Sequence, residues 1–96
     1  MSVHTKLKNN RETILKVASE HVVRNVKLFG SIARLEDEEE SDIDLLVSIG
    51  EGRSLFDLIR FKNEVEHIMD RNVDVVTEAA IHPSMKDQIL HEARSL

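Results

Sequence analysis

The side chains most able to do chemistry lie on three short segments. Gly30 and Ser31 follow one short apolar run, Asp42 and Asp44 open the next, and Asp74 lies inside a later β-branched run. Mg²⁺ prefers oxygen ligands from a few carboxylates and from substrate phosphates. A glycine lets the backbone turn tightly and approach a ligand closely. This combination predicts a metal-dependent site that acts on a phosphate-bearing substrate.

The D-x-D pair opens a predicted strand over residues 42–49. Successive side chains on a strand point to opposite faces, so Asp42 and Asp44 share one face and the apolar residues beside them share the other. Two carboxylates about 7 Å apart along a strand can jointly hold one or two Mg²⁺ ions.

The run Val26 to Phe29 is predicted to be a strand that leads into Gly30 and Ser31. The hydroxyl and amide of Ser31 could donate hydrogen bonds to phosphate oxygens. A short helix that starts at Ser31 would add free N–H groups and the positive end of its dipole. The turn is therefore a candidate phosphate site.

Asp74 lies in a third predicted strand, Val73 to Thr77, where Asp74 and Val76 share a face. If this strand pairs beside the D-x-D strand, Asp74 can face Asp42 and Asp44. Three such carboxylates repel one another, and a bound cation would remove that cost. The alternative is an ordinary strand-end acid that caps the strand or is solvated.

Three helices are predicted to support these strands. The first spans residues 9–23, with Asn9 as N-cap and Glu12 completing a capping box. The second follows Ser54 as N-cap, and the third begins at Pro83. The apolar stripe predicted for the second helix is Leu55, Leu58, Ile59, Val65, Ile68 and Met69.

The order of elements predicts an α/β (α+β) fold in one domain over residues 1–96. We expect a small mixed sheet of three to four strands, with helices packed mainly on one face and the carboxylate face more open. The last helix carries Ile89 and Leu90. These two residues are either candidate partner contacts or part of the domain's own core.

Composition narrows the class of protein. The formal net charge of −5 and the absence of Trp and Tyr disfavour direct nucleic-acid binding, which needs clustered cations and stacking platforms. The chain has no cysteine and no long apolar run, so we expect a cytoplasmic protein without a membrane span. The acidic run Glu36 to Glu40 is either a solvated loop or a contact for a basic partner.

The pattern G-S-x(10)-D-x-D, followed by V-D-V-V-T, resembles the minimal nucleotidyltransferases (MNT) of the polymerase-beta-like superfamily. Specifically, it resembles the antitoxins of HEPN–MNT toxin–antitoxin pairs, and the resemblance extends from Val26 to about Glu92. It implies the polymerase-beta-like nucleotidyltransferase fold. Carried over by position, it assigns the phosphate-binding turn to Gly30 and Ser31, with Arg34 as the basic residue that follows.

The same resemblance assigns the two metal-binding aspartates to Asp42 and Asp44 and the third catalytic carboxylate to Asp74. One position departs from the pattern, because Leu35 stands where many relatives have glycine. This departure bears on the path of residues 36–41 and leaves the carboxylates unaffected.

The resemblance implies a Mg²⁺-dependent enzyme that transfers AMP from ATP to a tyrosine hydroxyl of a cognate HEPN ribonuclease toxin. Asp74 would help to hold a second metal ion or accept the proton of the attacking hydroxyl. Because the chain is short, a partner protein or a second copy would supply the remaining contacts. The main alternative is an antitoxin that masks its toxin by binding alone, and transfer to a small molecule or an RNA end is a further one.

Overall fold

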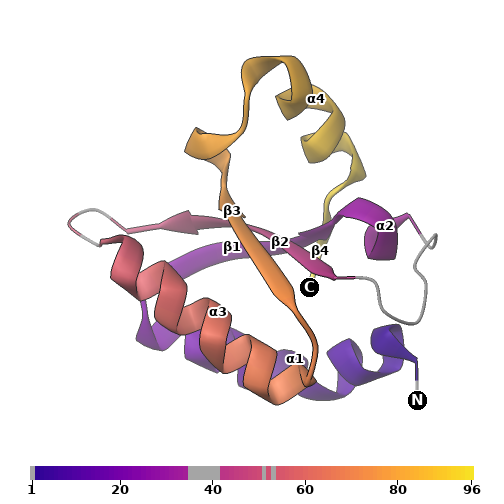
Figure 1. Cartoon of the computed structure of the whole chain (residues 1–96), viewed down its shortest axis with the longest axis vertical. Coiled ribbons are helices and arrows are strands. Elements are labelled where there is room, and N and C mark those ends of the chain that lie inside the picture. Colours follow the sequence, from indigo (N-terminus) through magenta and orange to yellow (C-terminus); the bar gives the residue numbers. More distant parts are fainter. Residues whose placement is uncertain (1, 35–41, 51, 53) are drawn as a thin grey trace.

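The computed structural model describes residues 2–34, 42–50, 52 and 54–96. The elements, labelled in Figure 1, are α1 (Val3–Glu20), β1 (Val23–Phe29), α2 (Gly30–Ala33), β2 (Ile43–Ile49), α3 (Leu55–Met69), β3 (Val73–Thr77), the 3₁₀ turn η1 (Glu78–Ala80), α4 (Pro83–Glu92) and β4 (Arg94–Ser95). None of the helices in these residues is both long and apolar enough to span a bilayer.

The strands form one mixed sheet in the order β3-β2-β1-β4. β1 runs antiparallel to β2 and to β4, whereas β2 and β3 are parallel. Parallel neighbours need a crossover connection, and α3 provides it. The predicted fold class is therefore confirmed. The sheet has four strands, the larger of the two numbers predicted.

The main core lies between the sheet and the two longest helices. α1 and α3 lie side by side across one face of the sheet (Figure 1), which confirms the prediction that helices cover mainly one face. α4 lies on the opposite side of the sheet and has no buried residue. The fully buried residues of this core include Ile14, Ile32, Ile43, Leu45, Phe61 and Val65.

The opposite face of the sheet, which carries Asp44, is only partly open. Leu46 points to this face and is fully buried, while its register partners Lys27 and Val76 are half-buried. Asp44 is half-buried and Asp74 is exposed. The predicted open carboxylate face is therefore limited to the end of the sheet where Asp44 and Asp74 lie.

The predicted limits of the first helix are wrong at both ends. α1 begins at Val3, where Ser2 is the N-cap and its Oγ accepts a hydrogen bond from the Thr5 amide at 3.2 Å. It ends at Glu20, before a residue with a positive φ of 54° at Val22. The buried residues of α1 are Val3, Leu7, Ile14 and Ala18. Because Val3 and Leu7 extend the stripe toward the N-terminus, the helix reaches beyond the predicted cap.

α3 forms where it was predicted, but its buried face is rotated. Ser54 is the N-cap, and its amide donates to Asp57 Oδ2 at 3.3 Å. The buried residues are Leu58, Phe61, Val65 and Met69. Leu55 and Ile59 were predicted to be buried and are instead 71% and 50% exposed. Phe61 fixes the orientation, because burying its large ring turns the first-turn leucine outward.

The C-terminal segment holds one element that the sequence did not predict. α4 begins at Pro83 as expected, but Ile89 and Leu90 are half-buried and do not join the main core. After it, the two-residue strand β4 pairs with β1, with Leu28 opposite Arg94. A strand this short leaves no alternating pattern to detect.

Candidate active site

Gly30 lies at the point where β1 turns into α2. Its φ of +77° is in the region that side-chain-bearing residues rarely adopt. A Cβ atom added at Gly30 would lie 2.2 Å from Asp44 Oδ2. Position 30 therefore requires glycine for two reasons. One is the backbone angle, and the other is the close approach of the Asp44 carboxylate.

The helix expected after this turn is present as α2, and it begins at Gly30 rather than at Ser31. Ser31 is half-buried in its first turn. The structure thus places the predicted phosphate turn directly against Asp44, at the end of β1 beside β2.

Asp44 and Asp74 lie directly opposite each other on the parallel strands β2 and β3. Residues in register on neighbouring strands point to the same face. On the other side of Asp44, β1 places Phe29 opposite it, immediately before Gly30. Asp42 lies just before β2 and is exposed. The predicted pairing of the two strands is present, and it brings Asp74 beside Asp44.

The electrostatic environment of Asp44 reflects this grouping. Burial raises the pKa of the Asp44 carboxyl, and the negative charges of Asp74 and Asp42 raise it further, whereas Arg34 acts in the opposite direction. Asp44 is thus a partly desolvated carboxyl that faces two like charges.

The chemistry of these side chains fits a hard divalent cation. Carboxylate oxygens are the ligands Mg²⁺ prefers, and a cation would relieve the repulsion among Asp42, Asp44 and Asp74. Within the part of the chain that the structure describes, no three acidic or histidine side chains are arranged as a ready-made metal-binding group. Completing a coordination shell would therefore take side-chain adjustment, or oxygen ligands from substrate and water.

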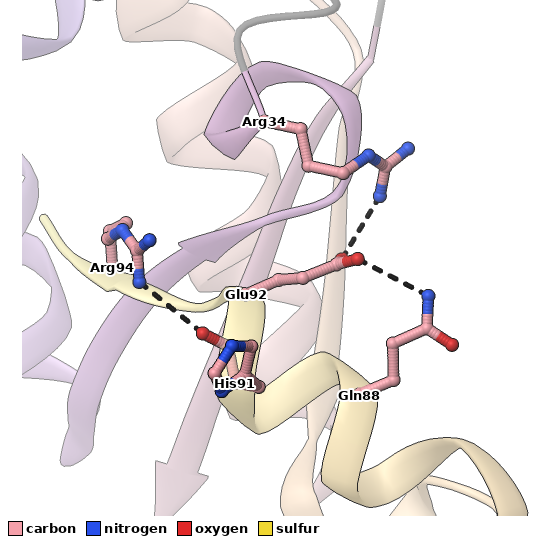
Figure 2. Close-up of polar contacts among 5 residues, drawn as sticks. All are labelled: Arg34, Gln88, His91, Glu92 and Arg94. Carbon is pink, nitrogen blue, oxygen red and sulfur yellow. Dashed lines mark hydrogen bonds and ion pairs between the residues drawn. The ribbon is translucent and has the colours of Figure 1, made fainter.

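Arg34, the residue directly after α2, extends toward α4 (Figure 2). Its Nη1 lies 3.0 Å from Glu92 Oε2, and Gln88 Nε2 donates to Glu92 Oε1 at 3.3 Å. These contacts, the hydrogen bond from Gln88 first, lower the pKa of Glu92. Arg34 was predicted from the sequence, whereas Gln88 and Glu92 were not, because no local pattern links α4 to a residue so far away in the chain.

A large surface hollow opens next to the site. It has a volume of about 790 Å³ and is lined by Asp42, Asn63, Glu66, His67, Asp70, Arg71 and Asn72. Of the predicted site residues only Asp42 lines it, so the carboxylate pair on β2 and β3 lies outside the hollow. Leu35 and the acidic run of residues 36–40 lie outside the described residues.

The chain is similar to known nucleotidyltransferases and protein adenylyltransferases. Residues 12–96 match the family described as polymerase beta, nucleotidyltransferase. A protein of Methanocaldococcus jannaschii named "Putative protein adenylyltransferase MJ0435" is 48% identical over 86% of this chain and 89% of its own length. "Protein adenylyltransferase MntA" of Thermococcus cleftensis is 33% identical over 73% of this chain and 71% of its own.

Two solved structures share the fold. One, described as "Structure of putative minimal nucleotidyltransferase", is 41% identical, covers 100% of this chain and 97% of its own, and has a TM-score of 0.88. A toxin–antitoxin structure with AMP-PNP matches with a TM-score of 0.74 over 90% of this chain and 71% of its own, at 19% identity. The resemblance seen in the sequence motifs is confirmed, and the chain belongs to the polymerase beta nucleotidyltransferase family.

Proposed function

We propose that this nucleotidyltransferase transfers AMP from ATP to a tyrosine hydroxyl of a HEPN ribonuclease toxin, with Mg²⁺ bound at the aspartates, and so acts as an antitoxin. The observation that carries the proposal is the register of Asp44 with Asp74 beside the Gly30 turn. Relatives named as protein adenylyltransferases support the reaction type. The toxin–antitoxin structure of the same fold supports a toxin as the partner.

The reaction is a substitution at the α-phosphorus of ATP. The acceptor oxygen forms a bond to that phosphorus, the bond to the β-phosphate's bridging oxygen breaks, and pyrophosphate leaves. Bound Mg²⁺ would neutralise charge on the phosphate oxygens. Catalysis of this kind depends mainly on positioning and on charge stabilisation.

Each described site residue has a task in this scheme. Gly30 and Ser31 hold the triphosphate against the start of α2, and Arg34 binds its oxygens. Asp42 and Asp44 would hold the metal ion. Asp74 lies next to Asp44 on the edge strand β3, where it helps to hold a second ion or accepts the proton that the acceptor hydroxyl loses.

The test is intact mass spectrometry of the purified chain incubated with its co-purifying or genetically adjacent partner, ATP and Mg²⁺. We expect the partner to gain mass in AMP-sized steps. The Asp42→Asn/Asp44→Asn variant should lose at least about 100-fold of the rate, because it removes the charges that face the reacting phosphate. Asp87→Asn is the matched control, because Asp87 is an exposed acid on α4.

The same experiment separates the proposal from its alternatives. A stable complex that blocks the toxin without any gain in mass would overturn transfer and support neutralisation by binding alone. Full activity of the Asp42→Asn/Asp44→Asn variant would contradict the assigned site. Repeating the incubation with GTP, CTP and UTP identifies the nucleotide.

A further inference from the structure

A polar link joins the end of the phosphate-turn helix to the end of α4. Arg34 follows α2 directly, and Glu92 is the last residue of α4. Their side chains meet at 3.0 Å, and Gln88, one turn earlier on α4, holds the second oxygen of Glu92 (Figure 2). The Glu92 side chain is only 19% exposed, so it is more shielded than an ordinary surface acid.

The link ends beside the carboxylates. Arg34 directly follows the four-residue helix α2, which begins at Gly30, and position 30 lies against the Asp44 carboxylate. Fixing Arg34 therefore fixes the far end of the phosphate turn.

α4 is well placed to provide this support. It has no buried residue, and β4, which follows it, pairs with β1. β1 is the strand that leads into Gly30. Glu92 is therefore carried by a segment that is anchored to the same strand as the phosphate turn.

We propose that Glu92 is a positioning residue that holds Arg34 in place to bind the phosphates of the nucleotide. This inference rests on the proposed function, because it takes Arg34 to be a phosphate ligand. A long, flexible arginine loses conformational entropy when a ligand fixes it, and a partner that fixes it beforehand removes that cost from binding. A guanidinium carries five N–H donors, so pairing with Glu92 is compatible with a phosphate contact.

If the Arg34–Glu92 pair served folding alone, its loss would lower the melting temperature and leave the affinity for nucleotide unchanged. Partly exposed ion pairs contribute little to the free energy of unfolding, so losing this pair should leave the melting temperature nearly unchanged. The affinity for nucleotide is thus the quantity that separates positioning from folding.

The experiment is calorimetric titration of the full chain with AMP-PNP and Mg²⁺. We expect Glu92→Gln, which keeps size and removes charge, to raise the dissociation constant about 2- to 10-fold, as loss of one pre-ordered side chain predicts. Arg34→Gln should raise it at least as much. The double variant should match Arg34→Gln alone, because Glu92 has no effect without its arginine.

Arg94→Gln is the control, because Arg94 lies next to the end of α4 and donates to the His91 carbonyl at 3.3 Å. It should bind AMP-PNP like the unchanged chain. In transfer assays, Glu92→Gln should raise KM for ATP and leave kcat within about 2-fold, as expected for a lost ground-state contact.

The outcomes are distinct. An unchanged dissociation constant for Glu92→Gln, or additive effects in the double variant, would overturn the positioning role even if the unchanged chain binds and transfers normally. An unchanged chain that neither binds AMP-PNP nor transfers AMP would instead contradict the proposed function. Circular dichroism melting of each variant separates both cases from misfolding.

Discussion

Gly30 and Asp44 lie against each other at the centre of the candidate site. Their closeness means that the turn proposed to bind phosphate and the carboxylate proposed to bind metal form a single structure. Any side chain at position 30 would displace Asp44, the residue that also lies in register with Asp74. We therefore expect the activity of the site to depend on position 30, which has no side-chain functional group of its own.

Replacement of Gly30 by alanine should reduce both stability and nucleotide binding. The positive φ costs about 1–2 kcal/mol for an L-residue, and displacement of Asp44 adds to it. We expect AMP transfer to fall at least about 100-fold, because the geometry of the carboxylates changes.

Gly52→Ala is the matched control for this substitution. Gly52 has nearly the same φ, +76°, but a Cβ there would meet nothing within 4 Å. It should lose stability to a similar backbone strain and retain transfer activity. Denaturant unfolding and an AMP-transfer assay measure the two effects, and a fully active Gly30→Ala variant would disprove the constraint.

Asp44→Asn should stabilise the metal-free protein at neutral pH. The pKa of Asp44 is raised in the folded chain above its ordinary value of 3.8, so the folded state binds this proton more tightly than the unfolded state does. Its ionised form therefore costs stability, and the cost grows as pH rises from that ordinary value through the raised one. Below the ordinary value the cost disappears.

The corresponding measurement is thermal melting with EDTA across pH 3 to pH 8. Because Asp44 is partly solvent-screened, we expect a gain of less than about 1 kcal/mol at neutral pH and none at the acidic end. Asp87→Asn should show no such trend. A destabilised Asp44→Asn variant at neutral pH would contradict the assigned environment.

At the scale of elements, α3 connects the parallel strands β2 and β3, and its orientation determines which of its side chains pack against the sheet. Its two phenylalanines provide a direct test, because Phe61 is fully buried and Phe56 is 72% exposed. Phe61→Ala should lower the free energy of unfolding by about 3–5 kcal/mol, since it leaves a cavity between α3 and the sheet. Phe56→Ala should change it by less than about 0.5 kcal/mol.

Urea unfolding measures both phenylalanine variants. Phe61→Leu keeps the test usable if the alanine variant does not fold, and it should show an intermediate loss. Equal losses for Phe56→Ala and Phe61→Ala would mean that the observed orientation of α3 is wrong.

Local patterns predicted the elements better than their limits or faces. The third strand and the helix starts at Ser54 and Pro83 were predicted correctly, because turn residues and capping side chains mark them. The start of α1 was missed because a cap at Ser2 competes with one at Asn9, and only packing against the sheet selects between them. The face of α3 was mistaken for a similar reason, since its apolar residues surround more than one side.

At the scale of the whole molecule, the candidate site forms because segments that are far apart in the sequence lie side by side in the fold. The D-x-D motif and the glycine turn could be read from sequence, because both depend on short spacings. The position of Asp74 beside Asp44 depends on strand order, so the sequence predicts it only on the condition that the two strands pair. The link between Arg34 and Glu92 could not be predicted, because α4 and α2 meet only through the course of the C-terminal segment.

The contact between Gly30 and Asp44 also gives the evolutionary loss of activity a preferred order. A change at Asp44 to a smaller residue removes the carboxylate but leaves the turn free to keep its conformation, so it adds no strain to the turn. A change at Gly30 displaces the carboxylate and strains the turn together. We expect descendants that turn to neutralisation by binding alone to lose the aspartate first and the glycine later.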